Sequence, residues 1–324
     1  MHKLSVLLPV KNGERFILES LVRIKESIRQ DDEVLVIDDS SSDRTARFLS
    51  SSVPNFPQLR VIRNPNPGLV NALNLGLQEA SNQWIARFDV DDEYPSSRLE
   101  NQRAIISKSN VGIFSDYSIW SEKKDFLGLI PSPVLPLATG ISIIQSQRTA
   151  HPSVIFNREA VLVVGGYREE DFPAEDVSLW LRLLRVGDLV SSPKDLLHYR
   201  LSSTSVSGSN YRLAKEKTKL LSLSLRLPNG FLSEAIMRCE ANLESYSLMS
   251  NSIQRQILHL KEMRYAIALF GCSENERVLL KKCFRDLFSS VSPYLKTIEL
   301  GYWKFKRNQV QAKSRSRNSL LKSN

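Results

Sequence analysis

Three carboxylates follow a short apolar run in the N-terminal part of the chain: Asp89, Asp91 and Asp92 come directly after residues 84–88. Such a run is typical of a buried strand, and open α/β sheets bind ligands outside the carboxyl ends of their strands. In an extended backbone Asp89 and Asp91 point to the same side. Two such oxygen ligands suit Mg²⁺ or Mn²⁺ shared with a substrate phosphate. Solvated acids in a turn are the alternative interpretation.

Two further acidic pairs could belong to the same site. Asp38 and Asp39 follow a predicted buried strand, and Glu175 and Asp176 precede a helical pattern. Clustered carboxylates repel one another unless a cation or hydrogen-bond donors offset the repulsion, which favours a bound ligand over coincidental turns. An acid after a strand also commonly contacts a nucleoside. The structural alternatives are a helix cap or turn for the first pair and helix N-terminal acids for the second.

Strand and helix patterns alternate along the first part of the chain, which is typical of an α/β fold with a mixed, mostly parallel sheet and helices on both faces. The expected strands are residues 3–10, 33–37, 59–63, 84–88, 111–114 and 153–156. The expected helices are 14–28, 44–50, 69–79, one beginning at Pro95, 158–164 and 177–184. Residues 125–147 carry no clear pattern. The later part has helical segments without alternation, so we predict a catalytic domain over residues 1–208 and an α-helical extension over residues 209–324.

Composition and charge narrow the class of protein. Hydrophobic residues make up 42% of the chain, and no apolar run approaches the roughly 20 residues of a membrane span. Because the apolar stretch at the N-terminus is short and the three cysteines are scattered, we expect a cytoplasmic protein. Part of the net charge of +9 lies in residues 303–324, which contain no acid. This basic tail is either solvated or in peripheral contact with an anionic inner membrane face, and no nucleic-acid partner is expected.

The ordered motifs of the chain resemble those of the family 2 glycosyltransferases. The matching segments are 5–13, 36–43, 68–76, 85–92, 151–156, 165–168 and 175–182, within about residues 3–205. The resemblance implies a GT-A fold, a nucleotide-diphosphate-sugar donor such as a UDP-sugar, transfer with inversion, and Mg²⁺ or Mn²⁺ as cofactor. It also implies a glycan or lipid-linked glycan acceptor, in cell-surface glycan or polysaccharide biosynthesis.

The same resemblance assigns the nucleotide side of the site. Pro9, Val10 and Asn12 match the loop at the nucleotide edge. Asp38 and Asp39 match the acids that hold the base and the ribose.

It also assigns the reaction centre. Asp91 matches the metal ligand of the Asp-x-Asp motif, and Asp89 lies nearer the ribose or the metal. Asp176, beside Glu175, matches the catalytic base. A carboxylate can take the proton of an acceptor hydroxyl, and a metal ion can stabilise charge on a departing phosphate.

Three other side chains, Arg87, His151 and Trp180, keep two interpretations each. No Gly-rich phosphate loop is present, so a bound diphosphate would need basic helpers such as Arg87 and Arg148. Arg87 can equally pair with the acidic cluster. His151 either shapes the acceptor side or is a hydrogen-bonded structural histidine. Trp180 either packs in the core or stacks on a sugar.

Two departures from the family pattern refine the prediction. Ser202 occupies a position where the family often has a histidine, so metal coordination from this segment is not expected. The Gln-x-x-Arg-Trp motif of processive synthases is absent, which favours single addition. The alternatives outside the family are a sugar-phosphate nucleotidyltransferase, which would want a Gly-rich loop near residues 9–13, and a non-catalytic nucleotide- or nucleic-acid-binding protein.

Overall fold

The computed structural model describes residues 2–132, 149–201, 213, 214, 216 and 217. The strands are β1 (Leu4–Val10), β2 (Glu33–Asp38), β3 (Leu59–Arg63), β4 (Trp84–Arg87), β5 (Asn110–Trp120), β6 (Phe126–Ile130), β7 (Ile155–Asn157) and β8 (Asp188–Arg200). The α-helices are α1 (Ile17–Ser27), α2 (Thr45–Ser52), α3 (Leu69–Glu79), α4 (Arg98–Arg103), α6 (Arg158–Val163) and α7 (Glu175–Leu183). The predicted boundary at 208/209, Arg148, Ser202 and the basic tail 303–324 lie outside these residues. The proposed helical extension lies almost wholly outside them.

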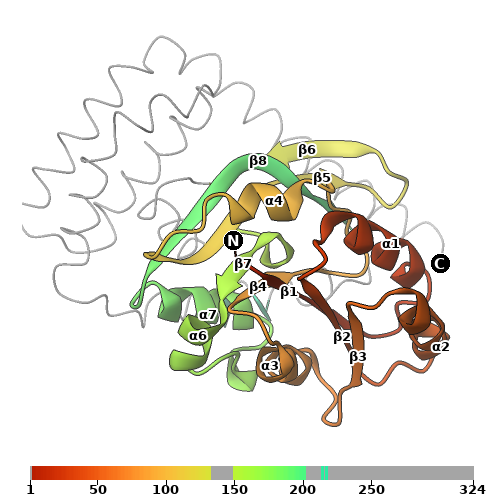
Figure 1. The fold of residues 1–324 in the computed structure, drawn as a ribbon. Helices are drawn as coiled ribbons and strands as arrows, with labels where there is room; N and C mark the ends of the chain where they lie inside the picture. Colours follow the sequence, from red (N-terminus) through yellow and green to blue (C-terminus); the bar gives the residue numbers. More distant parts are fainter. Residues whose placement is uncertain (1, 133–148, 202–212, 215, 218–324) are drawn as a thin grey trace, which may run out of the picture. The chain divides into compact units, whose positions relative to one another are not determined.

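In the described part of the chain, eight strands form one mixed sheet with the order β3-β2-β1-β4-β7-β5-β6, and β8 pairs with β5 (Figure 1). The neighbours β3-β2, β2-β1, β1-β4 and β5-β8 run parallel. Strand β7 is antiparallel to both β4 and β5, and β6 is antiparallel to β5. The sheet therefore confirms the predicted mixed, mostly parallel α/β class.

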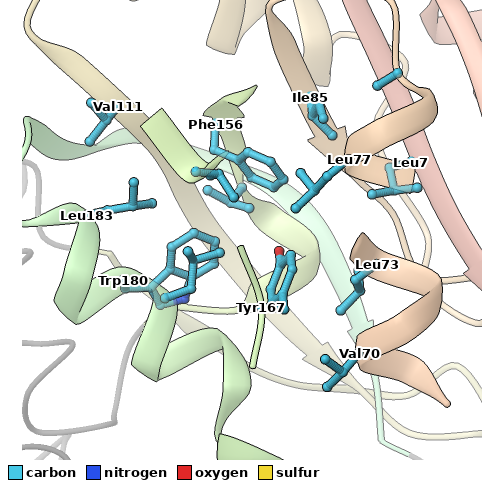
Figure 2. Close-up of a cluster of buried hydrophobic side chains, with 14 of the residues drawn as sticks. Leu7, Val70, Leu73, Leu77, Ile85, Val111, Phe156, Tyr167, Trp180 and Leu183 are labelled. Atoms are coloured by element: carbon cyan, nitrogen blue, oxygen red, sulfur yellow. The ribbon is translucent and has the colours of Figure 1, made fainter. Parts of the chain in front are cut away.

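Helices cover both faces of this sheet (Figure 1). Because successive strand residues point to opposite faces, Leu7 of β1 joins one hydrophobic cluster while Val6 and Leu8 join the other. Helices α3, α6 and α7 pack on the Leu7 face, where Figure 2 shows Phe156 and Trp180 close together. Helices α1, α2 and α4 pack on the other face. Burial on both sides explains why β1 and β2 are continuous apolar runs.

Two strands were not predicted, and a third is longer than expected. Strand β6 lies inside the unassigned stretch 125–147, and β8 was not predicted. Strand β5 also continues to Trp120, well past the expected end at 114, and pairs with β8 through several register shifts. Among the described residues, no helix is both long and apolar enough to cross a membrane.

A buried ion pair joins the amino edge of the sheet to α4. The Asp32 carboxylate accepts bonds from Arg103 Nη2 at 2.7 Å and Arg103 Nη1 at 3.1 Å. It also accepts the Leu4 N–H at 2.8 Å and the Arg29 N–H at 2.9 Å. The side chains of Asp32 and Arg103 are 0% and 3% exposed. Asp32 therefore fixes the start of β1, and with it the register that places the far ends of the strands.

Replacing Asp32 by alanine should destabilise the protein by about 3–5 kcal/mol, because the Arg103 guanidinium would stay buried without its partner. The measurement is the free energy of unfolding from urea titration. The control is the same change at the neighbouring, exposed Asp31, which should have little effect. Equal stabilities for the two variants would contradict the anchoring role of Asp32.

Candidate active site

The carboxyl ends of β1, β2 and β4 meet at one edge of the sheet. Val10, the last residue of β1, pairs with Asp38, the last residue of β2. The Asp39 N–H donates to the Val10 carbonyl at 2.8 Å, and the Phe88 N–H donates to the Leu7 carbonyl at 3.0 Å. The fold thus brings the Pro9–Val10 end of β1, the first acidic pair and the loop after β4 to the same edge.

The loops after β1 and β2 hold each other through Asn12. This residue has a φ of 53°, a left-handed conformation that asparagine tolerates better than most residues. Its Oδ1 accepts the Ser42 N–H at 2.8 Å, and its own N–H donates to Ser41 Oγ at 2.9 Å. Lys11 Nζ lies 3.8 Å from Asp39 Oδ2 and brings a positive charge to this edge.

Asp38 and Asp39 are both buried; Asp38 takes part in a local turn, while Asp39 bonds the segment that follows β3. Asp38 Oδ1 accepts the Ser41 N–H at 3.1 Å. Asp39 Oδ1 accepts Asn64 Nδ2 at 2.7 Å and the Gly68 N–H at 2.8 Å. The Asp38 bond is of the kind expected from the turn interpretation, whereas the Asp39 bonds join two loops that lie far apart in the chain. Together these bonds use one oxygen of each carboxylate, and a carboxylate has about four acceptor positions, so capacity remains for a ligand.

Arg87 is the buried cation of the site. Its side chain is 2% exposed, Nη2 lies 2.6 Å from Asp89 Oδ1, and Nη1 donates to the Phe88 carbonyl. Burial opposes its charge, but the Asp89 carboxylate raises the pKa of Arg87. The sequence left open whether Arg87 helps to bind a diphosphate or pairs with the acidic cluster. The structure contains the second arrangement, the ion pair with Asp89.

The acidic loop after β4 is supported by the end of β8. Asp92 is buried, its Oδ1 accepts the Arg200 N–H at 2.8 Å, and its Oδ2 has no hydrogen-bond partner within the described part of the chain. Arg200 Nε donates to the Asp91 carbonyl at 2.8 Å. Burial and the Asp89 charge raise the pKa of Asp91 to about 6, as expected for crowded carboxylates. Asp92, which had no role from the sequence, thus fixes this loop to β8.

The donor set of this loop fits a divalent cation. Asp89 and Asp91 provide carboxylate oxygens, which Mg²⁺ and Mn²⁺ prefer, and their mutual repulsion would be relieved by a cation. Among the described residues no three histidine, cysteine, aspartate or glutamate side chains converge on one point. A cation held here would therefore share its coordination with substrate oxygens and water.

The third acidic pair forms the first two residues of helix α7, which begins two residues before the predicted start at 177. Asp176 Oδ1 accepts the Val177 N–H at 2.7 Å, while Glu175 is buried and its Oε2 has no hydrogen-bond partner among the residues that the structure describes. Burial and the Asp176 charge raise the pKa of Glu175 to about 7, and burial also raises the pKa of Asp176. The charges of Arg87 and Asp89 act on both carboxyls, so this pair lies within electrostatic range of the loop after β4.

His151 and Trp180 belong to a packed aromatic group. His151 Nε2 lies 2.8 Å from the Tyr167 hydroxyl, and burial holds the pKa of His151 well below its usual value, so the ring is neutral. Trp180 is 0% exposed and lies among buried hydrophobic side chains (Figure 2). It packs edge-on against Phe114, with ring centroids 5.2 Å apart. A fully buried ring offers no face to a sugar, so Trp180 is a core residue. His151 makes the hydrogen bond of the structural interpretation.

A clamp that the sequence did not suggest fixes the segment before α7. Asn74 on α3 accepts the Tyr167 N–H at 2.9 Å and donates to the Tyr167 carbonyl at 2.9 Å. At the preceding Gly166, φ is 63° and an added Cβ would lie 2.7 Å from Asn74 Oδ1. Asn74 lies in segment 68–76 and Tyr167 in segment 165–168, and both segments match the family. Neither segment alone indicates that these two residues contact each other.

The fold and site define an α/β enzyme with acidic loops at the sheet edge where such folds bind nucleotides. A protein-family model described as "Glycosyl transferase family 2" matches residues 5–132. The UDP-Gal:alpha-D-GlcNAc-diphosphoundecaprenol beta-1,3-galactosyltransferase of Escherichia coli is 30% identical over 198 residues, which are 57% of this chain and 69% of that protein. The chain belongs to the family 2 glycosyltransferases, and it is a glycosyltransferase.

Solved structures agree with this fold. The complex of S. aureus TarS 1-349 with UDP-GlcNAc has a TM-score of 0.57 at 18% identity, covering 93% of this chain and 92% of that one. The mannosyltransferase PcManGT from Pyrobaculum calidifontis, in complex with GDP-Man and Mn²⁺, has a TM-score of 0.54 at 18% identity, covering 92% and 86%. At these identities the likeness concerns the fold alone, and it confirms the expected GT-A architecture.

Proposed function

We propose that this protein transfers a sugar from a UDP-sugar to an acceptor hydroxyl, with inversion and with the help of Mg²⁺ or Mn²⁺. The observation that carries the proposal is the carboxylate cluster at the end of β4, where Asp89 pairs with the buried Arg87 at 2.6 Å, together with the acidic pair Glu175 and Asp176 at the start of α7. One cluster suits a donor phosphate with its cation, and the other suits proton transfer.

The donor would lie along the carboxyl edge of the sheet. Pro9, Val10 and Asn12 would border the nucleotide, and Asp38 and Asp39 would receive the base and the ribose. The E. coli relative is named for UDP-Gal and the TarS complex for UDP-GlcNAc, which support a UDP-sugar here.

A divalent cation would be held by Asp91, with Asp89 nearer the ribose or sharing the cation. When bound, it would stabilise the negative charge of the departing diphosphate. Arg87 would act from within the protein, by holding Asp89 in place through their 2.6 Å ion pair. The Mn²⁺ in the PcManGT complex supports a metal-dependent donor site.

The transfer step needs one proton acceptor. In the proposed step Asp176 takes the proton of the acceptor hydroxyl, and the oxygen forms a bond to the anomeric carbon of the donor. The bond from that carbon to the donor phosphate oxygen breaks, and its electron pair leaves with the nucleoside diphosphate. Attack from the side opposite the leaving group inverts the configuration. Glu175, beside the base, would adjust its charge environment.

The acceptor would be a glycan or lipid-linked glycan, as the name of the E. coli relative suggests. We assign catalysis to residues 1–208 and propose that residues 209–324 form an α-helical extension. Its basic tail, residues 303–324, would be attracted to the anionic surface that carries a lipid-linked acceptor.

A thermal-shift experiment tests the donor and the metal together. A UDP-sugar with Mn²⁺ should raise the Tm, because a ligand that binds only the folded state stabilises it, by about 2.7 kcal/mol at 100 times its Kd. GDP- and dTDP-sugars should give smaller shifts, and EDTA should reduce the UDP-sugar shift. No shift with any nucleotide sugar in the presence of Mn²⁺ would count against the proposal, and an unchanged shift in EDTA would remove the metal from it.

A further inference from the structure

A cavity of about 120 Å³ lies beside the acidic loop. It is at the ends of β5 and β8, two strands that lie side by side in the sheet (Figure 1). Its lining residues are Glu93, Trp120, Ser121, Lys124, His198 and Arg200. None of them has a role in the donor site described above except Arg200, which supports the acidic loop. The cavity is smaller than the roughly 300–1,000 Å³ of drug-sized pockets, so it suits a single small ring.

One wall of this cavity is aromatic and held in place. The Trp120 indole N–H donates to Ser118 Oγ at 2.8 Å, which fixes the plane of the ring. The His198 ring lies beside it, with centroids 5.5 Å apart and planes inclined by 42°. Phe126 packs edge-on against Trp120 at 5.4 Å. A fixed, half-buried indole presents a flat apolar face next to polar groups.

The rim of the cavity carries hydrogen-bonding charges. Glu93 lies 3.1 Å from Lys124 Nζ, 3.1 Å from Arg200 Nη2 and 3.0 Å from Arg23 Nη1. Three cations thus share one carboxylate. Since an ammonium has three N–H donors and a guanidinium has five, donors remain for a ligand. A rigid aromatic face bordered by charged donors and a carboxylate is suited to a sugar ring, which has apolar C–H faces and hydroxyls around its edge.

The cavity is next to the reaction centre. Glu93 is two residues after Asp91, so their Cα atoms are at most about 7.6 Å apart. The backbones of Glu93 and His198 exchange hydrogen bonds of 2.8 and 3.1 Å. Arg200 contacts both the cavity and the Asp91 carbonyl. A group held here would therefore be within reach of a sugar being transferred at the acidic loop.

We propose that this cavity binds one sugar unit of the acceptor glycan, adjacent to the unit whose hydroxyl is attacked. Trp120 packs against the ring face, and Lys124, Arg200 and Glu93 hydrogen bond its hydroxyls. The assignment rests on the proposed function, and it identifies the acceptor as a chain of at least two sugar units.

The test measures saccharide binding to the full-length protein with UDP and Mn²⁺ present. The probes are the methyl glycosides of glucose, galactose and N-acetylglucosamine, titrated by saturation-transfer-difference NMR. At least one glycoside should bind the wild type, and Trp120→Leu should weaken that binding roughly three- to tenfold. Trp120→Phe should restore most of it. The matched control is Leu129→Ala, an exposed apolar truncation on the same hairpin outside the cavity lining, which should bind like the wild type.

The donor-induced Tm shift separates the possible failures. If the wild type shows no shift with any UDP-sugar, the proposed function fails, and the cavity assignment fails with it. If the shift is present but no glycoside binds, or Trp120→Leu binds as well as the wild type, the cavity assignment alone is overturned. If circular dichroism shows that Trp120→Leu does not fold, Lys124→Gln decides, because its exposed side chain can be changed without opening the core. Unchanged binding in that variant then overturns the assignment.

Discussion

Replacing Asp176 by asparagine should lower the rate of sugar transfer by roughly 10²- to 10⁴-fold and leave donor binding unchanged. Asparagine has the same shape, and its side-chain oxygen can still accept the Val177 N–H bond of 2.7 Å. Helix α7 therefore keeps its first turn, and what is lost is a carboxylate able to take the acceptor proton. The measurements are kcat for transfer from a UDP-sugar and the Tm shift produced by the donor.

The pH profile provides a second readout of the same variant. Because burial raises the pKa of Asp176, its carboxylate is protonated at a higher pH than that of an exposed aspartate. The wild-type kcat should therefore fall as the pH is lowered through this pKa, and the residual rate of the asparagine variant should lack that fall.

The control for Asp176 is Glu159→Gln, which removes an exposed acid from the first turn of the neighbouring helix α6. If Asp176 only complements the helix dipole, both changes would cost about 0.3–1 kcal/mol of stability and leave kcat unaffected. Full activity of the asparagine variant would rule out its role as the base.

Replacing Asp91 by alanine should weaken Mn²⁺-dependent donor binding by at least about 10- to 100-fold. A loss of this size is typical when a residue that only supports a metal ligand is changed, and Asp91 is expected to be a ligand itself. We expect this loss because Asp91 is the carboxylate proposed to hold the cation against the diphosphate. Burial and repulsion from Asp89 both disfavour the ionised form of Asp91, so its removal should not lower the Tm of the metal-free protein. The measurement is donor affinity with Mn²⁺ and with EDTA.

The comparison variant is Asp31→Ala, the same chemical change at an exposed residue beyond the opposite edge of the sheet. It should keep the Mn²⁺ dependence of the wild type. An Asp91→Ala protein with unaltered Mn²⁺ dependence would show that another group holds the cation.

The sequence predicted the elements whose side chains repeat regularly. Strand β3 and helix α3 have the predicted bounds, 59–63 and 69–79, because a short apolar run and a 3.6-residue apolar period are local signals. Strand β8 was not predicted because its apolar pattern is interrupted by residues 191–195, Ser-Ser-Pro-Lys-Asp. It is held as a strand by pairing with β5, far away in the chain.

The candidate site, like the fold, could be predicted only in part. The three acidic clusters could be found from the sequence, since each directly follows a strand or begins a helix. The partners that orient them could not, because the contact of Asp92 with Arg200 joins residues 108 positions apart. Trp180 was ambiguous for another reason: a tryptophan suits a core and a sugar site equally, and only its 0% exposure decides between them.

The bond between Asp92 and Arg200 also sets an order of assembly. Closing a loop of this length costs chain entropy, which other contacts of β8 with β5 must offset. During synthesis the N-terminal strands emerge and can fold first. The acidic loop can make its contact with Arg200 only after β8 has paired with β5. A chain synthesised only as far as β7 would thus have the parallel strands β1 to β4 but would lack the Asp92–Arg200 contact that supports the acidic loop.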